Sequence, residues 1–222
     1  MVQKRPTEHP GRGESESRPT GQPVRQPQQD RSMATKERII DAGFRLFSEK
    51  GYHKTNSKEI ARMAGSGIGT FYDYFSDKKS LFLEILCRHR DGFLQSLQVP
   101  VFDNKITKLQ LKRIVGEFIQ YVFAFHENAP EFHKEAVLLR HSDSDIEGIM
   151  NEWDEALRKI IYNLLDAMHA QVRLKDTEAA AYIILRTIED NIHFIHLSSV
   201  SIDKDRLQNE LVDLIYIYIF GK

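Results

Sequence analysis

The chain has 222 residues, with 31 Lys and Arg against 32 Asp and Glu, and its 41% of hydrophobic residues is typical of a soluble globular protein. It contains no run of about 20 apolar residues, the length that a membrane span requires, and its N-terminus lacks the apolar core of a secretion signal. Its single cysteine, Cys87, excludes a framework of intramolecular disulfides and suits a reducing compartment. We therefore expect a cytoplasmic protein with no membrane partner.

Residues 1–32 hold five of the seven prolines and only two aliphatic side chains, Val2 and Val24. Such a segment buries too little apolar surface to offset the entropy of ordering, so we expect a disordered tail. Its six Lys and Arg against four acids also allow weak contact with DNA, although an inert tail is the simpler interpretation.

A first helix is predicted over residues 33–50, because apolar side chains recur there at helical spacing. Gly51 follows at the position where a glycine commonly ends a helix. This helix is expected to act as a scaffold for the next two.

Residues 56–75 are predicted to form two short helices joined by a turn. The first opens on Asn56, and Glu59 follows three residues later, which is the spacing of a capping box. Gly65-Ser66-Gly67 interrupts the helical pattern, which resumes at Ile68. Two helices joined by a turn of three or four residues that contains glycine are typical of a helix-turn-helix unit.

The remainder of the chain has helical periodicity throughout and no convincing strand, so we predict an all-α fold. Residues 33–80 carry nine Lys and Arg against six Asp and Glu, whereas residues 81–222 carry 16 against 22. A basic head on an acidic body suits a head that meets phosphates. Helices are expected at about 77–97, 106–126, 130–140, 146–169, 179–197 and 206–220.

Residues 39–86 match a known family at fixed internal spacing and without gaps. The matching positions are Ile40, Leu46-Phe47, Gly51-Tyr52, Thr55, Ile60-Ala61, Ala64-Gly65, Gly69-Thr70-Phe71-Tyr72, Tyr74-Phe75, Lys78 and Leu81. In this pattern the chain resembles the TetR/AcrR-type transcriptional regulators. The resemblance implies an N-terminal helix-turn-helix domain in residues 33–80, joined by a long helix to a helical effector-binding and dimerisation domain in residues 81–222. It also implies a homodimeric repressor that a small-molecule effector releases from double-stranded DNA with a near-palindromic operator.

Carried over by position, the resemblance places the helix that begins at Ile68 in the major groove. The isoleucine cannot hydrogen-bond a base, although it can touch a thymine methyl group, and Gly67 and Asp73 offer little to a phosphate. We therefore expect phosphate contacts to dominate binding. The DNA-binding candidates are Ser57, Lys58, Ile68, Gly69, Thr70, Tyr72, Tyr74 and Lys78.

The effector is expected to bind in the C-terminal body, because small-molecule pockets are mostly apolar with a few placed polar groups. The same residues would serve equally as core or as a dimer seam, and the resemblance assigns the last two helices to a four-helix interface with a second copy. The candidates are Phe118, Tyr121, Val122, Phe125, His126, Trp153, Leu157, Glu189, Asn191 and His193.

Three other classes of function are weighed against this interpretation. His193 and His196 share a helical face, but zinc sites need three or four ligands, so we predict no metal site and no cofactor. The sequence has no phosphate-binding glycine loop, nucleophile elbow or zinc protease motif, which argues against an enzyme. The remaining alternative is an effector-independent DNA-binding protein whose body only dimerises or binds a protein partner.

Overall fold

The computed structural model describes residues 27–97, 107–197 and 202–221, and in these ranges the chain forms nine α-helices and no strand. This confirms the all-α prediction. The helices are α1 (Pro27–Lys50), α2 (Ser57–Met63), α3 (Ile68–Tyr74), α4 (Lys78–Ser96), α5 (Lys108–Asn128), α6 (Pro130–Arg140), α7 (Ser144–Ala167), α8 (Thr177–Leu197) and α9 (Lys204–Phe220).

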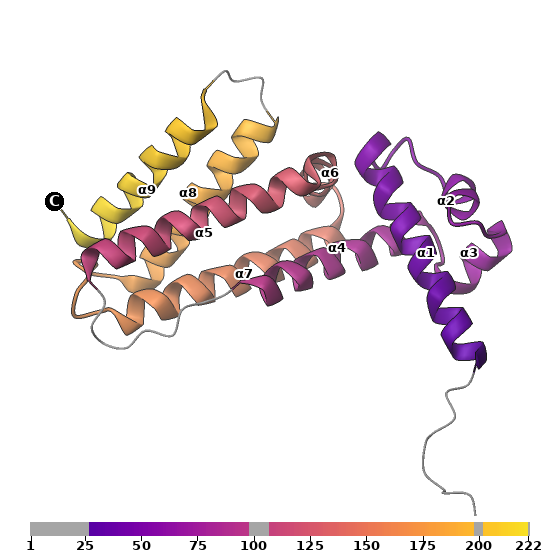
Figure 1. The fold of residues 1–222 in the computed structure, drawn as a ribbon, viewed down its shortest axis with the longest axis horizontal. Helices are drawn as coiled ribbons and strands as arrows, with labels where there is room; N and C mark the ends of the chain where they lie inside the picture. The colour runs from indigo at the N-terminus through magenta and orange to yellow at the C-terminus, as the bar shows by residue number, and fades with distance from the viewer. Residues whose placement is uncertain (1–26, 98–106, 198–201, 222) are drawn as a thin grey trace, which may run out of the picture.

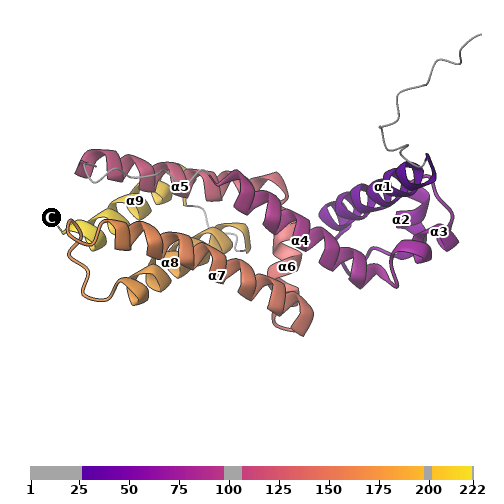
Figure 2. The same ribbon diagram turned by 90° about the horizontal axis from the view of Figure 1, so that it is seen from below.

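The molecule is elongated, with a small head of α1, α2 and α3 at one end and a larger body at the other (Figure 1). The body contains α5, α7, α8 and α9, and α7 packs along α8 while α5 packs along α9. Helix α4 starts in the head and runs into the body, and α6 lies at the end of the body that faces α1 (Figure 2). The expected domain boundary at residue 80 therefore falls within the first turn of α4.

Helix α1 is longer than the sequence pattern predicts. It begins at Pro27 rather than Met33, so the assignment of residues 27–32 to a disordered tail is wrong. Asp30, Arg31 and Ser32 in the added turns are exposed, and the Met33 side chain that follows is 62% exposed. These turns extend a helix whose C-terminal half is already stabilised by its apolar side chains. Adding a turn costs little free energy once a helix exists. Residues 1–26, the rest of the expected tail, lie outside the described residues.

The head is held by a core that its three helices share with α4. Ile39 and Phe47 of α1, Ile60 of α2, Phe71 of α3 and Phe82 of α4 are all fully buried. Burial of each such side chain contributes about 1.5–3 kcal/mol. The two short helices depend on this core, because seven residues are too few to form a stable isolated helix.

The body owes its layers to amphipathic helices. Helix α7 shows this best, because every third or fourth residue from Ile146 to Leu165 is buried while the opposite face is charged. No described helix combines the length and the hydropathy that crossing a membrane would require.

Candidate nucleic-acid interface and internal cavity

Helices α2 and α3 are placed by local signals that the sequence carries. The Asn56 side chain accepts a hydrogen bond from the Glu59 backbone N–H, which confirms the predicted cap of α2. Gly65 has φ +66°, a left-handed conformation that glycine adopts without strain, and it turns the chain between the two helices. These signals set α3 beside α2 at the far end of the head (Figure 1).

Helix α3 has one buried side and one open side. Phe71 is fully buried and faces the core, whereas Tyr72 is 56% exposed. Gly69 and Asp73 are also exposed, and Thr70 is partly exposed. An amphipathic helix of this kind has the geometry to enter a major groove with its open side.

The other DNA candidates lie around this open side. Lys58 is exposed at the start of α2, and Ser57 and Ile68 are partly exposed. The Tyr74 hydroxyl lies 2.9 Å from the Ser32 hydroxyl, so the first turns of α1 flank the end of α3. Sequence reasoning did not foresee this contact, because it treated Ser32 as part of the tail.

Lys78 has a second role that the sequence pattern did not indicate. Its ammonium donates to the backbone carbonyls of Tyr52 at 2.8 Å and of Thr55 at 3.1 Å, and it lies 4.3 Å from the centre of the Tyr52 ring. Burial lowers the pKa of Lys78, and the nearby Glu135 carboxylate opposes that shift. An ammonium has three donor hydrogens, so two tie α4 to the loop before α2 and one is left for the predicted phosphate contact.

A partly open cavity of about 600 Å³ lies in the body between α5, α7, α8 and α9, at the C-terminal end of α4. Its walls are almost entirely aliphatic, and a few polar groups stand among them, including the Tyr121 hydroxyl, the Ser96 hydroxyl and the Glu117 carboxylate. The Tyr121 and Ser96 hydroxyls are hydrogen-bonded to each other, which joins α5 to α4. The lining residues are Ser96, Leu97, Ile114, Val115, Glu117, Phe118, Tyr121, Ile160, Ile161, Leu164, Leu165, Met168, Ile184, Ile188, Ile215 and Ile219.

Two of the ten predicted pocket residues, Phe118 and Tyr121, line this cavity. Four others, Val122, Phe125, Trp153 and Leu157, are packed in the core instead and do not line it. Helical periodicity indicates which side chains point inward, but it does not say which neighbouring helix they meet. The aliphatic residues of α7, α8 and α9 that complete the wall were missed for the same reason.

The predicted His126 belongs to a buried cluster of aromatic and imidazole rings between α4, α5, α6 and α7. His126 stacks on His133 with ring centres 4.4 Å apart, and Nε2 of His133 lies 2.9 Å from Nε2 of His89. Burial, together with the charge of His126, lowers the pKa of His89 to about 4. Phe125 and Trp153 pack against the same rings. In the described part of the chain, no three His, Cys, Asp or Glu side chains are arranged to hold a metal ion.

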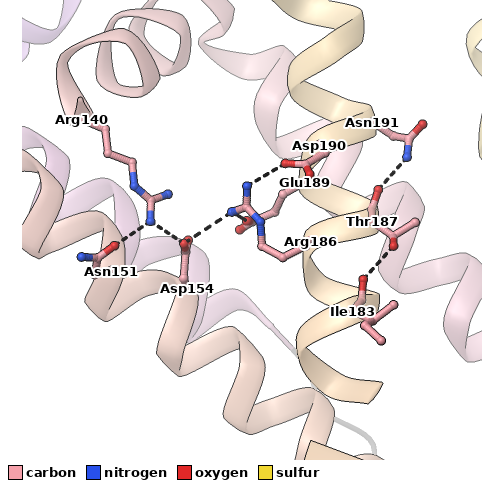
Figure 3. A network of polar contacts seen from close by, with 9 residues as sticks. All are labelled: Arg140, Asn151, Asp154, Ile183, Arg186, Thr187, Glu189, Asp190 and Asn191. Carbon is pink, nitrogen blue, oxygen red and sulfur yellow. Dashed lines mark hydrogen bonds and ion pairs between the residues drawn. The ribbon is translucent and has the colours of Figure 1, made fainter. Parts of the chain in front are cut away.

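The three predicted polar pocket residues of α8 lie elsewhere. Glu189 is buried and pairs at 3.0 Å with Arg186, which also contacts Asp154 and Asp190 (Figure 3). Asn191 donates to the Thr187 carbonyl of its own helix.

His193, the third of these residues, lines a separate polar cleft of about 650 Å³ that the α6, α7 and α8 side chains of this network surround. None of Glu189, Asn191 and His193 lines the aliphatic cavity, so their contact with an effector stays a prediction.

The head matches a known family in the residues that build it. Residues 39–85, from within α1 to within α4, match the family described as bacterial regulatory proteins, tetR family. The head belongs to the tetR family of bacterial regulatory proteins. The match covers the helix-turn-helix unit and its supporting helices, which are the parts whose geometry suits a DNA groove.

Similar proteins extend the likeness from the head of this chain to its body. The chain is 23% identical over 187 residues to the fatty acid metabolism regulator protein of Bacillus subtilis, covering 83% of this chain and 95% of that protein. The solved structure of FadR from Bacillus subtilis in complex with stearoyl-CoA matches with a TM-score of 0.61 and 21% identity, over 83% of this chain and 99% of that one.

A third likeness is to a transcriptional regulator from Saccharomonospora viridis, solved in complex with choline. It gives a TM-score of 0.71 at 18% identity, over 86% of this chain and all of that one. At these identities the solved structures establish a shared fold.

Proposed function

We propose that this regulator is a homodimeric repressor that binds a near-palindromic operator and leaves it when a small apolar molecule occupies the cavity. The observation that carries the proposal is the position of the cavity, which meets the C-terminal end of α4 while the N-terminal end of α4 carries the head. A ligand that contacts the C-terminal end of α4 therefore acts on the helix whose N-terminal end carries the head.

DNA binding is proposed to use the open side of α3 with the start of α2. Tyr72, Tyr74, Ser57 and Lys58 would hold phosphates, and Thr70 with the backbone at Gly69 would approach the bases. Phosphate contacts position a protein on DNA, and base contacts give it sequence preference. Two heads would read half-sites roughly 34 Å apart, one turn of the duplex.

Dimerisation is proposed to use α8 and α9. These helices carry exposed apolar side chains, with Phe194 53% exposed on α8 and Leu214 57% exposed on α9. Apolar patches on a helix face are typical of interfaces between subunits.

The effector is proposed to be a molecule with an alkyl chain. The aliphatic walls of the cavity support this, and so does the relative that was solved with stearoyl-CoA. A volume of about 600 Å³ lies within the range of about 300–1,000 Å³ that small-molecule sites occupy.

The first experiment is to sequence the genomic fragments that the purified protein retains and to measure its affinity for them. A recovered palindrome bound with nanomolar affinity is expected, and failure to retain any sequence above background would reject the proposal.

The effector is then sought by adding fatty acids and acyl-CoA thioesters of increasing chain length to the complex. Release of the fragment together with a rise in melting temperature supports ligand-driven release. Unchanged binding across the series favours the effector-independent alternative.

A further inference from the structure

The turn between α1 and α2 is held at the backbone of one residue, Tyr52, from two sides. The backbone N–H of Tyr52 donates to the Glu135 carboxylate of α6 at 3.0 Å. The carbonyl of the same residue accepts from Lys78 of α4 at 2.8 Å. These two side chains belong to the two helices through which the body reaches the head.

The turn has room for this contact only because residue 51 is a glycine. Gly51 has φ +79°, and a Cβ atom built there would lie 2.6 Å from Oε1 of Glu135. The buried Thr55 hydroxyl donates to the Gly51 carbonyl at 2.9 Å and closes the turn over the end of α1. The turn is thus a fixed unit, and moving it moves the start of α2.

Helix α6 is coupled to the cavity by the chain itself. Helix α5 contributes Val115 and Phe118 to the cavity wall and ends at Asn128, and α6 begins at Pro130. Ala129 alone separates the two helices, and its side chain is buried. A translation of α5 along its axis, or a rotation about that axis, is therefore transmitted to α6 almost directly.

Helix α4 gives the second route. Its C-terminal end, at Ser96 and Leu97, touches the cavity, and its first residue, Lys78, holds the Tyr52 carbonyl. Two routes from one cavity, through α5 and α6 and through α4, therefore meet at the backbone of a single residue of the head, Tyr52.

We propose that Glu135 is a positioning residue, whose carboxylate on the Tyr52 N–H fixes the orientation of the DNA-binding head relative to the body and so sets the half-site spacing that the dimer accepts. The inference rests on the proposed function. To that function it adds the residue through which α6 holds the head. A hydrogen bond to a charged acceptor is strong enough to select one orientation among close alternatives, because leaving either partner unpaired is costly.

The test uses the full chain and a set of operators built from the recovered palindrome, with the half-sites moved apart or together by one and two base pairs. Each base pair shifts a half-site by roughly 3.4 Å along the duplex. The wild type is expected to prefer one spacing sharply. Glu135→Ala is expected to reduce its preference over the next spacing by about tenfold, the size of one hydrogen bond to a charged group.

Glu135→Gln keeps an acceptor oxygen at the same reach and is expected to restore most of the spacing preference. The matched control is Glu131→Ala on the same helix, because Glu131 is exposed and its ion pair is with Lys134 of the same helix, at 3.9 Å. If Glu135→Ala does not fold, as judged by its melting curve, Glu135→Asp takes its place, because it keeps the charge and withdraws the oxygen from the turn.

Binding by Glu135→Ala that is weaker by the same factor at every spacing would overturn the proposal, since it would indicate a merely structural role. A spacing profile identical to that of the wild type would also overturn it. Loss of all DNA binding by the wild type itself rejects the proposed function instead, so the two failures are distinct.

Discussion

Tyr72 is the residue of α3 whose surroundings best suit a contact with DNA. Its ring packs edge-on against Phe71, with 5.4 Å between ring centres, and more than half of the side chain faces solvent. The Tyr72 side chain is therefore accessible to a phosphate of bound DNA.

Tyr72→Phe is expected to weaken operator binding by about tenfold, because a hydrogen bond from the hydroxyl to a charged phosphate is lost. The melting temperature should stay unchanged, since the hydroxyl contributes nothing to the core. Titration against the recovered operator measures the effect. Tyr182→Phe on α8 is the matched control, because Tyr182 is 58% exposed and lies in the body. Equal affinities for wild type and Tyr72→Phe would remove Tyr72 from the set of phosphate contacts.

Glu189 makes the stability of the body depend on pH. Burial, aided by the nearby charge of Asp154, raises its pKa to about 8, and this outweighs the opposing influence of Arg186 and Arg140. A carboxyl group with a raised pKa in the folded state binds its proton more tightly there than in the unfolded chain. It therefore stabilises the fold below about pH 4.5, and this contribution is lost progressively as the pH rises through about 8.

Glu189→Gln is expected to flatten this part of the stability profile, because an amide does not titrate. The slope that one proton can contribute is at most about 1.4 kcal/mol per pH unit. Urea unfolding at several values between pH 5 and pH 8.5 measures the change. If wild type and variant lose stability in parallel over this range, Glu189 does not titrate as assigned.

At the scale of elements, the sequence was most informative where its signals are local. Asn56, Glu59, Gly51 and Gly65 each specify a cap or a turn by their own chemistry, so α2, α3 and the turn between them were predicted to within a few residues. The end of α1 at Lys50 was likewise placed by Gly51. The beginning of α1 was not predicted correctly, because exposed turns at the end of a helix have no apolar pattern that would indicate them.

The cavity was predicted poorly because it depends on which helices meet. Phe118 and Phe125 lie two turns apart on α5, yet Phe118 lines the cavity while Phe125 packs on His89 of α4. Helical periodicity likewise did not show that Glu189, which interrupts the apolar pattern of α8, lies on the side of the helix that faces α7. Helical periodicity identifies the face of a helix that is buried, but only the tertiary structure shows which helix packs against that face.

Filling the cavity from α5 is expected to separate ligand response from DNA binding. Val115→Trp places a large ring in the cavity, whose lining is mostly aliphatic. The variant should bind the operator like the wild type but should no longer be released by the acyl compound that releases the wild type. Leu138→Trp is a suitable control, because Leu138 is 55% exposed on α6 and lies outside the cavity. Release of Val115→Trp at the wild-type ligand concentration would place the effector elsewhere.

At the scale of the whole molecule, the proposed dimer explains why apolar side chains remain exposed on α8 and α9. Leu214 and Ile217 of α9 are 57% and 45% exposed, although α9 is held firmly to α5 by its other face. A surface of this kind is costly in a monomer and favourable between two copies.

Leu214→Glu is expected to convert the dimer to a monomer, because it buries a charge in the interface. Light scattering after gel filtration measures the mass, and operator affinity should fall at least a hundredfold since one head alone reads one half-site. Lys159→Glu, on the exposed side of α7, controls for the change of charge. A dimeric Leu214→Glu variant would show that the copies meet through another surface.

The length of α4 determines how small a tilt of this helix would be enough to release the operator in the proposed mechanism. With 19 residues, α4 is about 28 Å long. Tilting a rod of that length by about 5° about its cavity end carries its other end through roughly 2.4 Å, and two copies tilting apart separate the heads by nearly 5 Å. That exceeds the rise of one base pair, roughly 3.4 Å. In the proposed mechanism, an effector would therefore need to tilt α4 by only a few degrees to move the two heads off their half-sites.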